Sequence, residues 1–351
     1  MSFSFVLNVI DAVKKGDLAK LNELHYPSAD YSICSQNQRT LLMIALNNNH
    51  THVVRWLLLH GADVEQQDES GFTALHYACE KGNVAAVKML LACGANVQAD
   101  AGIGWTPLHE AVWENKQSVV KLLIKASALI DVKDEDGNTP LHLAAMKGLL
   151  SSTIMLLNAG CDIDATNHLG DTPLHLASVN QHEVIISVLL KRDAKVAIKN
   201  KAGNTALMCT VLTGNLMIIR LLLEKSANVN ETNLKMQTPL MKLMISKHLN
   251  VVTINSIITL FAAHEANLFL KDSDDWTALH YAALLQQAPV IEHLCQQYQI
   301  SESMIENIRL QRKISVVFGD ERVFKLLHDH LGVNYNSGGY VTEAVQLVKD
   351  F

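Results

Sequence analysis

Histidine offers the most chemistry in this sequence, because an imidazole can act as a general base or bind a metal ion. The chain has 351 residues and sixteen histidines. Five of these stand three residues after a threonine: His76, His109, His142, His175 and His280. His328 and His330 are separated by one residue, a spacing that turns their rings apart on a helix. We therefore predict no metal site.

Cysteine and glycine patterns also argue against catalysis and against a bound cofactor. The closest two of the six cysteines are Cys79 and Cys93, so there is no Cys-x-x-Cys pair. A nucleophilic cysteine would need a base and an orienting acid at matching positions, and the sequence pattern offers neither. The run Gly-Ile-Gly-Trp at residues 102–105 lacks the third glycine of a dinucleotide-binding loop. We predict no catalytic residue and no cofactor.

Charge and hydropathy restrict the partners and the location. The net charge is −6 and lysine and arginine form no block, which disfavours nucleic acid and anionic membranes as partners. No basic region precedes the short apolar run at the start of the chain, which argues against a signal peptide. Residues 202–219, the longest stretch without a charge, contain Gly, Asn and Thr and are too polar to span a bilayer. We expect a monomer in the cytoplasm.

A threonine recurs at a constant step of 33 over most of the chain. The positions are Thr40, Thr73, Thr106, Thr139, Thr172, Thr205 and Thr238, and Thr277 follows after a longer step. The residues around these threonines repeat as well, for example "GNTPLHLAAMKG" and "GDTPLHLASVNQ". A fixed period of this length indicates one supersecondary unit copied many times.

Each unit reads as two helices joined by turns. Thr followed by Pro is a strong helix start, since the hydroxyl accepts from a free backbone N–H and Pro fits the first helical position. Glycines such as Gly148, nine residues after the threonine, suit a left-handed helix end. Residues 84–94 show apolar spacing of three and four, typical of a second helix with one buried face. Neither helix can bury that face alone, so the units must stack.

The stretch "HGADVEQQDESGFTALHYACEKGN" at residues 60–83 resembles the ankyrin-repeat family, and the resemblance covers about residues 36–298. It implies an all-α solenoid in which each repeat is a β-turn finger followed by two antiparallel helices. It also implies a structural role for the five histidines, which in that family bond neighbouring backbone, and for the capping threonines such as Thr106.

The same period predicts degenerate repeats beyond the clear ones. The same step, taken outward from Thr40 and from Thr277, reaches Leu7 and Leu310, each followed nine residues later by a glycine. We predict ten modules within a solenoid of residues 1–333, including caps at 1–35 and 299–333. The remaining tail, 334–351, is either a helix that packs on the last repeat or a flexible docking or address segment.

One repeat is longer than the others and two lack a turn glycine. Six extra residues fall between Lys247 and Glu265, where the resemblance implies the loop between the two helices. Met236 and Asp275 stand where other repeats have the turn glycine. The local geometry of this region is left open by the sequence.

Trp105 and Trp113 flank one capping threonine, Thr106. Phe72 occupies the place of Trp105 in the preceding repeat, with Tyr77 available to pack against it as a hydrophobic staple. Trp105 meets Glu110 instead, and we expect it to lack a packing partner. The resemblance places Trp113 on the concave face, where residues vary with the partner.

An apolar row continues from Trp113 through the equivalent positions Met146, Val179, Leu212, Ile245 and Leu284. A long apolar stripe on a soluble monomer usually marks an interaction site. The alternative for Val179, Leu212 and Ile245 is that they close gaps between first helices. The predicted partner-binding residues are Trp105, Trp113, Phe72, Tyr77, Glu80, Lys81, Glu114, Met146, Lys147, His168 and Leu169.

The sequence thus predicts a non-catalytic scaffold or adaptor. Its partner would be another protein, with a helix or extended segment in the concave groove. Two alternatives stay open: an ankyrin-repeat effector that an intracellular bacterium secretes into a host cell, and a subunit that positions the substrate of an enzyme complex.

Overall fold

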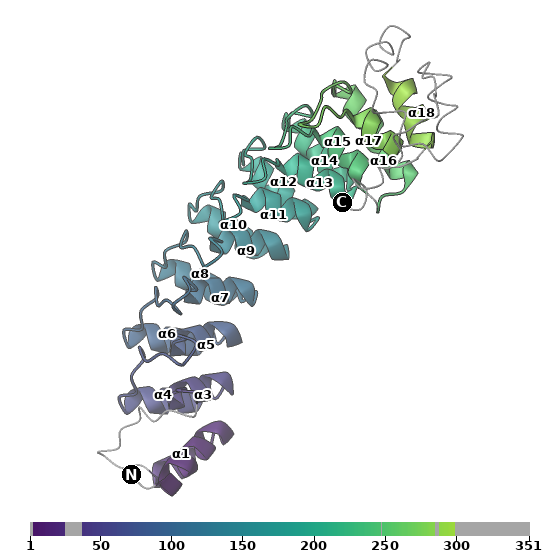
Figure 1. The fold of residues 1–351 in the computed structure, drawn as a ribbon. Coiled ribbons are helices and arrows are strands. Elements are labelled where there is room, and N and C mark those ends of the chain that lie inside the picture. The colour runs from purple at the N-terminus through teal and green to yellow at the C-terminus, as the bar shows by residue number, and fades with distance from the viewer. Residues whose placement is uncertain (1–2, 25–36, 247, 285–287, 299–351) are drawn as a thin grey trace. The chain divides into compact units, whose positions relative to one another are not determined.

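The computed structural model describes residues 3–24, 37–246, 248–284 and 288–298, and within these ranges the regular structure is helical (Figure 1). The predicted terminal cap 299–333, the tail 334–351, and His328 and His330 lie outside the described residues. The helices are α1 (Phe3–Lys15), α2 (Leu18–Glu23), α3 (Leu41–Asn47), α4 (Thr51–Leu59), α5 (Ala74–Lys81), α6 (Val84–Ala92), α7 (Pro107–Trp113), α8 (Gln117–Lys125), α9 (Pro140–Lys147), α10 (Leu150–Asn158), α11 (Pro173–Val179), α12 (Glu183–Lys191), α13 (Ala206–Thr213), α14 (Leu216–Glu224), α15 (Pro239–Ile245), α16 (Val251–Ala263), α17 (Ala278–Leu284) and α18 (Ala288–Gln297).

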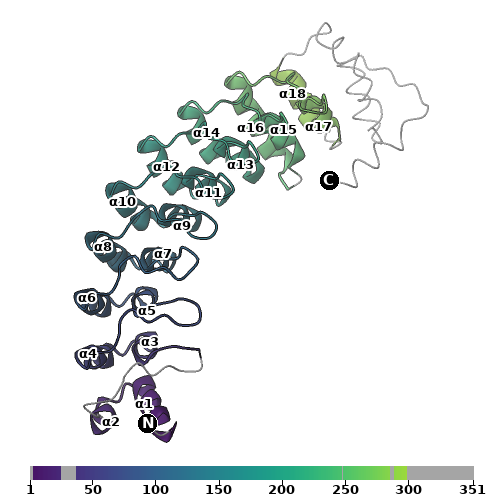
Figure 2. The same cartoon turned by 60° about the vertical axis from the view of Figure 1, so that its left-hand side comes forward.

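The chain divides into two compact units, Met1–Leu189 and Leu190–Phe351, and the boundary falls within the sequence of α12. In the first unit α3, α5, α7, α9 and α11 pack side by side in chain order, and α4, α6, α8 and α10 form a second row (Figure 2). In the second unit α13, α15 and α17 form one row and α14, α16 and α18 another. The prediction that helix pairs stack in sequence order is confirmed within each unit.

The core runs between the two rows of helices. Leu75, Leu108 and Leu141, each two residues after its threonine, are at most 1% exposed. Burial of a leucine side chain contributes about 2 kcal/mol, so every repeat adds a similar increment. Trp56 in α4 is also buried, and its indole N–H donates to Asn22 Oδ1 at 2.8 Å.

A buried histidine links the starts of α5, α7 and α9 to the next repeat. The backbone N–H of Thr106 donates to His109 Nδ1 (3.2 Å), so this nitrogen carries no proton. Nε2 therefore carries the proton and donates to the carbonyl of Asn138 in the following repeat (3.2 Å). His76 and His142 do the same to the carbonyls of Trp105 and Asp171. These contacts agree with the structural role that the resemblance implies.

The glycines that end the first helices are required for two reasons, the left-handed backbone and the close approach of the next repeat. Gly82, Gly148 and Gly214 have φ between +71° and +74°, confirming the predicted left-handed ends. A Cβ on Gly148 would also lie 2.6 Å from Nδ1 of His182 in the next repeat. That ring stays close because His182 Nε2 bonds the carbonyl of Met146 at 2.9 Å.

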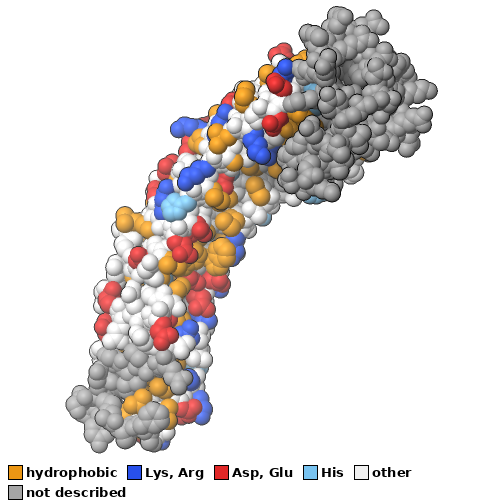
Figure 3. Space-filling view, viewed as in Figure 1, with side chains coloured by type: hydrophobic (Ala, Val, Ile, Leu, Met, Phe, Trp, Pro, Cys, Tyr) orange, Lys and Arg blue, Asp and Glu red, His pale blue; other side chains and the backbone are white. Residues whose placement is uncertain are grey.

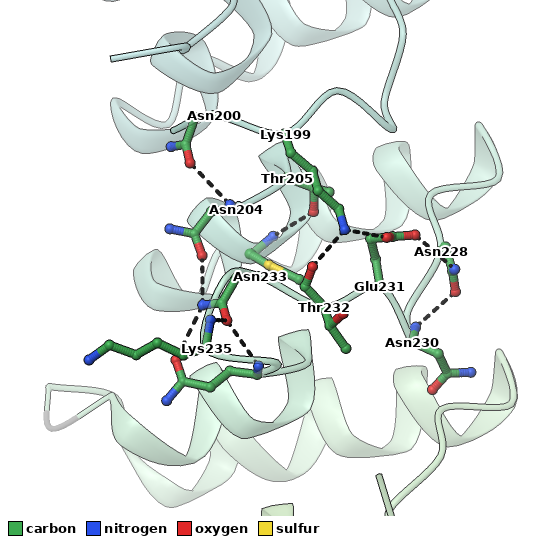
Figure 4. A network of polar contacts seen from close by, with 12 residues as sticks. Lys199, Asn200, Asn204, Thr205, Asn228, Asn230, Glu231, Thr232, Asn233 and Lys235 are labelled. Carbon is green, nitrogen blue, oxygen red and sulfur yellow. Dashed lines mark hydrogen bonds and ion pairs between the residues drawn. The ribbon is translucent and has the colours of Figure 1, made fainter. Parts of the chain in front are cut away.

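Loops of consecutive repeats are joined by hydrogen bonds. In the second unit Lys199 Nζ bonds the Thr232 carbonyl at 2.7 Å and Glu231 at 2.6 Å, and Asn233 Nδ2 donates to Asn204 Oδ1 at 3.2 Å (Figure 4). In the first unit the loops approach so closely that a Cβ on Gly104, at φ +71°, would lie 2.2 Å from the Lys133 carbonyl oxygen.

The six extra residues do fall between Lys247 and Glu265, but the expectation that they belong to the loop between the two helices is mostly wrong. Helix α16 has 13 residues where α14 has nine, so four of the six lengthen the helix, and only two extend the preceding connection. The apolar run in α16 favours continued helix, with Ile254, Ile257, Ile258 and Phe261 all buried. Met236 (φ +57°) and Asp275 (φ +63°) keep the left-handed turn without glycine.

The buried histidines predict acid sensitivity. Burial lowers the pKa of His76 and of His142 from 6.5 to about 4, so below pH 6.5 the unfolded chain binds protons that the folded chain does not. Stability is then full above pH 6.5 and falls toward pH 4, by at most about 1.4 kcal/mol per pH unit for each histidine. Urea unfolding of wild type and His142→Ala at pH 7 and pH 5 checks this. The variant should be less stable at pH 7 by about 2 kcal/mol but lose less between the two pH values, and equal losses would contradict the argument.

Gly104→Ala and Gly102→Ala should differ in their effect on stability. Both positions have positive φ, at +71° and +85°, but a Cβ on Gly102 meets nothing within 4 Å. Each alanine carries the left-handed backbone cost of about 1–2 kcal/mol, and only Gly104→Ala also pushes the next loop away. We expect Gly104→Ala to lower the free energy of unfolding by about 2 kcal/mol more than Gly102→Ala does. Chemical denaturation measures the free energy of unfolding of both variants. Equal losses would contradict this prediction, because they would show that the neighbouring loop moves aside at no measurable cost.

Candidate protein-binding surface

Trp105 and Trp113 come from opposite ends of α7, and their rings meet alongside the helix. Trp105 precedes the helix and Trp113 is its last residue, and their ring centroids lie 6.1 Å apart with the planes inclined by 71°. Trp113 is 37% exposed, whereas Trp105 is half-buried. We call Trp105, Glu110, Trp113 and Lys147 the indole site.

The expectation that Trp105 lacks a packing partner is wrong. Its indole N–H donates to Glu110 Oε2 at 2.7 Å, and its ring stacks on His109 at 5.5 Å between centroids. The sequence argument considered only an apolar partner at position 110, but an indole also carries a hydrogen-bond donor that a carboxylate can accept.

Glu110 is a carboxylate in a buried position, where a charged group is unfavourable. The residue is 8% exposed. Burial raises the pKa of Glu110 above its usual value, the hydrogen bond from Trp105 acts in the opposite direction, and the negative charges of Glu80 and Glu114 raise it further. Three acidic side chains, Glu80, Glu110 and Glu114, therefore lie close enough to interact in the neighbourhood of Trp105.

Lys147, the last residue of α9, completes the site from the next repeat. Its Nζ lies 3.9 Å from the centroid of the Trp113 ring and donates to the Trp113 carbonyl oxygen at 2.5 Å. An ammonium over an indole face is attracted to the negative face of the ring, which is worth about 0.5–1 kcal/mol at an exposed site.

Tyr77 does not belong to the accessible surface. It is 5% exposed, and its hydroxyl donates to Asp68 Oδ2 at 2.6 Å. Tyr77 is therefore removed from the predicted partner contacts because its side chain is sealed in the core. Phe72 is half-buried and packs on Tyr77 with centroids 6.4 Å apart, as the staple argument predicts. Trp276 packs on Tyr281 in the same way, with centroids 5.3 Å apart.

The other predicted contact residues are accessible to different degrees. In the first unit Val179 is 52% exposed and Met146 is half-buried, while in the second Leu212 is 37% exposed and Ile245 is half-buried. The side chain of Leu284 is outside the description. Glu80 and Lys81 form an ion pair at 2.7 Å. Glu114 is half-buried, and His168 and Leu169 are exposed in a loop.

Sequence reasoning missed the charge of the loops beside the indole site. Loops 60–72, 93–105, 126–138 and 159–171 together hold twelve Asp and Glu but one lysine, Lys133. Loops 192–204 and 225–237 hold six Lys and Arg and two acids. The net charge of the whole chain conceals this contrast, which counting by loop would have found. Figure 3 shows acidic and apolar side chains together on the face in view.

The stacked helix pairs and their linked loops define a helical repeat protein. The family model for ankyrin repeats matches residues 9–101, 96–167 and 151–233, which together exceed half of the chain. The chain belongs to the ankyrin-repeat family. Such repeats have a capacity for protein–protein interaction and are generally not catalytic.

A curated relative supports the repeats but nothing beyond them. The chain is 38% identical over 72 residues to diacylglycerol kinase zeta of Rattus norvegicus, a match that covers 20% of this chain and 8% of the relative. This length corresponds to about two repeats. The chain thus spans less than a tenth of that relative's length.

The cysteines and histidines form no evident chemical centre in the described part of the chain. No three His, Cys, Asp or Glu side chains there are arranged to hold a metal ion. Burial raises the pKa of Cys79, and that of Cys161 to about 12, which keeps both as thiols. None of the helices described combines the length and the apolar character that crossing a bilayer requires.

The buried carboxylate predicts a titration visible in tryptophan fluorescence. Since the pKa of Glu110 is raised and Trp105 bonds this carboxylate, wild-type emission should change with a midpoint above pH 4.5. Glu110→Gln should remove the change, and Glu114→Gln, the control, should retain it. A carboxyl group whose pKa is raised by folding contributes stability at low pH, and this contribution is lost as the pH rises through the raised pKa. Glu110→Gln should therefore be at least as stable as wild type at pH 7. A titration that persists in Glu110→Gln would contradict the assignment.

Proposed function

We propose that this protein is a non-catalytic scaffold or adaptor that binds a segment of another protein across the first-helix face of its first unit. The contact would centre on Trp113, with Met146, Phe72 and the half-buried Trp105 beside it. The half-buried Glu80, Lys81 and Glu114 and the exposed Lys147 would form the polar rim.

The exposure of Trp113 carries this proposal. An indole costs little entropy to immobilise and buries a large area, and tryptophan is enriched among residues that dominate binding energy. Trp113 is also held in place before any partner arrives, by Trp105 on its edge and Lys147 on its face. A pre-positioned side chain lowers the ordering cost of association.

The ankyrin repeats themselves give an independent reason to expect a protein partner. Their helices supply a fixed frame, since each first helix packs on the next within the unit. Neighbouring side chains on that frame present apolar groups from consecutive repeats, Trp113, Met146 and Val179 among them. A helix or an extended segment can contact such a row at regular intervals.

Trp113→Ala tests the proposal, with Leu59→Ala as a matched control, because Leu59 is 79% exposed but lies on a second helix, α4. Immobilised wild type and both variants are used to capture partners from lysate, and each captured protein is then purified and titrated. We expect Trp113→Ala to weaken binding about 30-fold, or about 2 kcal/mol, and Leu59→Ala to bind like wild type. Unfolding of Trp113→Ala should change by less than about 1 kcal/mol. Partners that bind Trp113→Ala as tightly as wild type would defeat the proposal.

A further inference from the structure

The chain's own lysine shows what the exposed indole of Trp113 can hold. Lys147 Nζ lies 3.9 Å from the ring centroid, while the side chain as a whole is exposed. The attraction comes from the negative face of the ring and does not depend on which residue supplies the cation. An ammonium or guanidinium group from another molecule can therefore take the place of Lys147.

The surroundings of that ring favour positive charge. Glu110 is buried and bonded to Trp105, and the negative charges of Glu80 and Glu114 act on it together with the positive charge of Lys147, the cation to be replaced. Trp105 stands at 71° to Trp113, and its indole N–H donates to the Glu110 carboxylate, so a buried carboxylate borders the pair of rings. A cation on the Trp113 ring is attracted by the ring electrons and by the neighbouring carboxylates together.

The negative charge continues along the adjoining loop. Asp131, Glu135 and Asp136 are exposed in the loop that follows the Trp105 loop, and the two loops touch where the Lys133 carbonyl approaches Gly104. Figure 2 shows the loops of the first unit extending beyond α5, α7 and α9, away from α6 and α8. The acidic loops thus border the same side of the unit as the indole site.

We infer that the partner segment is basic and that one of its lysine or arginine side chains lies on the Trp113 ring in place of Lys147, with further cations facing the acidic loops. This inference rests on the proposed function and adds the chemistry of the partner. Lys147 then has two roles: it shields the indole in the free protein and returns to water when the partner's cation arrives. Charge of opposite sign along the loops would speed association and make it sensitive to salt.

The cation site can be tested with choline and its neutral analogue 3,3-dimethylbutan-1-ol, followed by tryptophan fluorescence. We expect saturable choline binding at least fivefold tighter than that of the alcohol, and none in Trp113→Ala. Lys147→Ala should bind choline at least threefold more tightly because the ring face is free, whereas Lys88→Ala, which removes an exposed lysine from α6, should match wild type. Equal binding of choline and alcohol, or unchanged or weaker choline binding in Lys147→Ala, would overturn the inference.

The acidic loops are tested with hexalysine and hexaglutamate. Hexalysine should bind more tightly than choline and weaken on raising salt from 50 to 200 mM, and both Trp113→Ala and the triple variant Asp131→Asn, Glu135→Gln, Asp136→Asn should reduce its affinity at least fivefold. Binding of hexaglutamate as tight as that of hexalysine, or hexalysine binding unaffected by either variant, would overturn the basic-partner inference.

The two proposals fail in different ways. A captured partner that depends on Trp113 but contacts it through a neutral or acidic segment would leave the proposed function intact and refute the basic partner. A choline site in a protein whose captured partners ignore Trp113 would refute the proposed function.

Discussion

The hydrogen bond from a buried histidine to a carbonyl of the next repeat is the constraint on which the candidate surface of the first unit depends. His76, His109 and His142 each accept from a threonine N–H at their own helix start and donate to backbone one repeat further on. One neutral ring thus fixes a helix start and the spacing to the next loop. Protonation would place a second donor against the threonine N–H, which is why the fold favours the neutral ring.

That constraint also places the candidate surface. The carbonyl that accepts from His76 belongs to Trp105, so the preceding repeat holds the backbone of the indole site. The ring of Trp105 stacks on His109, and the ring of Trp113 packs against Trp105. Lys147 comes from the repeat that follows. Three consecutive repeats therefore determine where one exposed indole lies, although no segment of the site is longer than a single helix.

The repeated helices could be predicted because their signals are local. Thr-Pro at a helix start and glycine at its end act on neighbouring backbone groups, and both devices appear as predicted at Thr106 and Gly148. Spacing could not show that Tyr77 turns inward to Asp68, or that Trp105 bonds Glu110, because those outcomes depend on side-chain direction at the junction of loop and helix. The contact of Lys147 with Trp113 joins two different repeats. The repeat period brings these two residues close together, but it does not determine that the ammonium group lies on the ring.

Glu110 is the residue that repeat packing explains least. Of the equivalent positions, Ile44, Tyr77, Leu143 and Tyr281 are buried and apolar or aromatic, whereas Leu176, Cys209 and Lys242 are half-buried. Glu110 thus places a charged group at a buried version of this position. A carboxylate at 8% exposure costs desolvation energy that the single hydrogen bond from Trp105 offsets only in part. Residues that lower stability and that packing does not explain tend to occur where a protein binds or reacts. The cost at Glu110 is therefore consistent with a site that attracts a partner's positive charge, since that charge would offset the desolvation that the free protein bears alone.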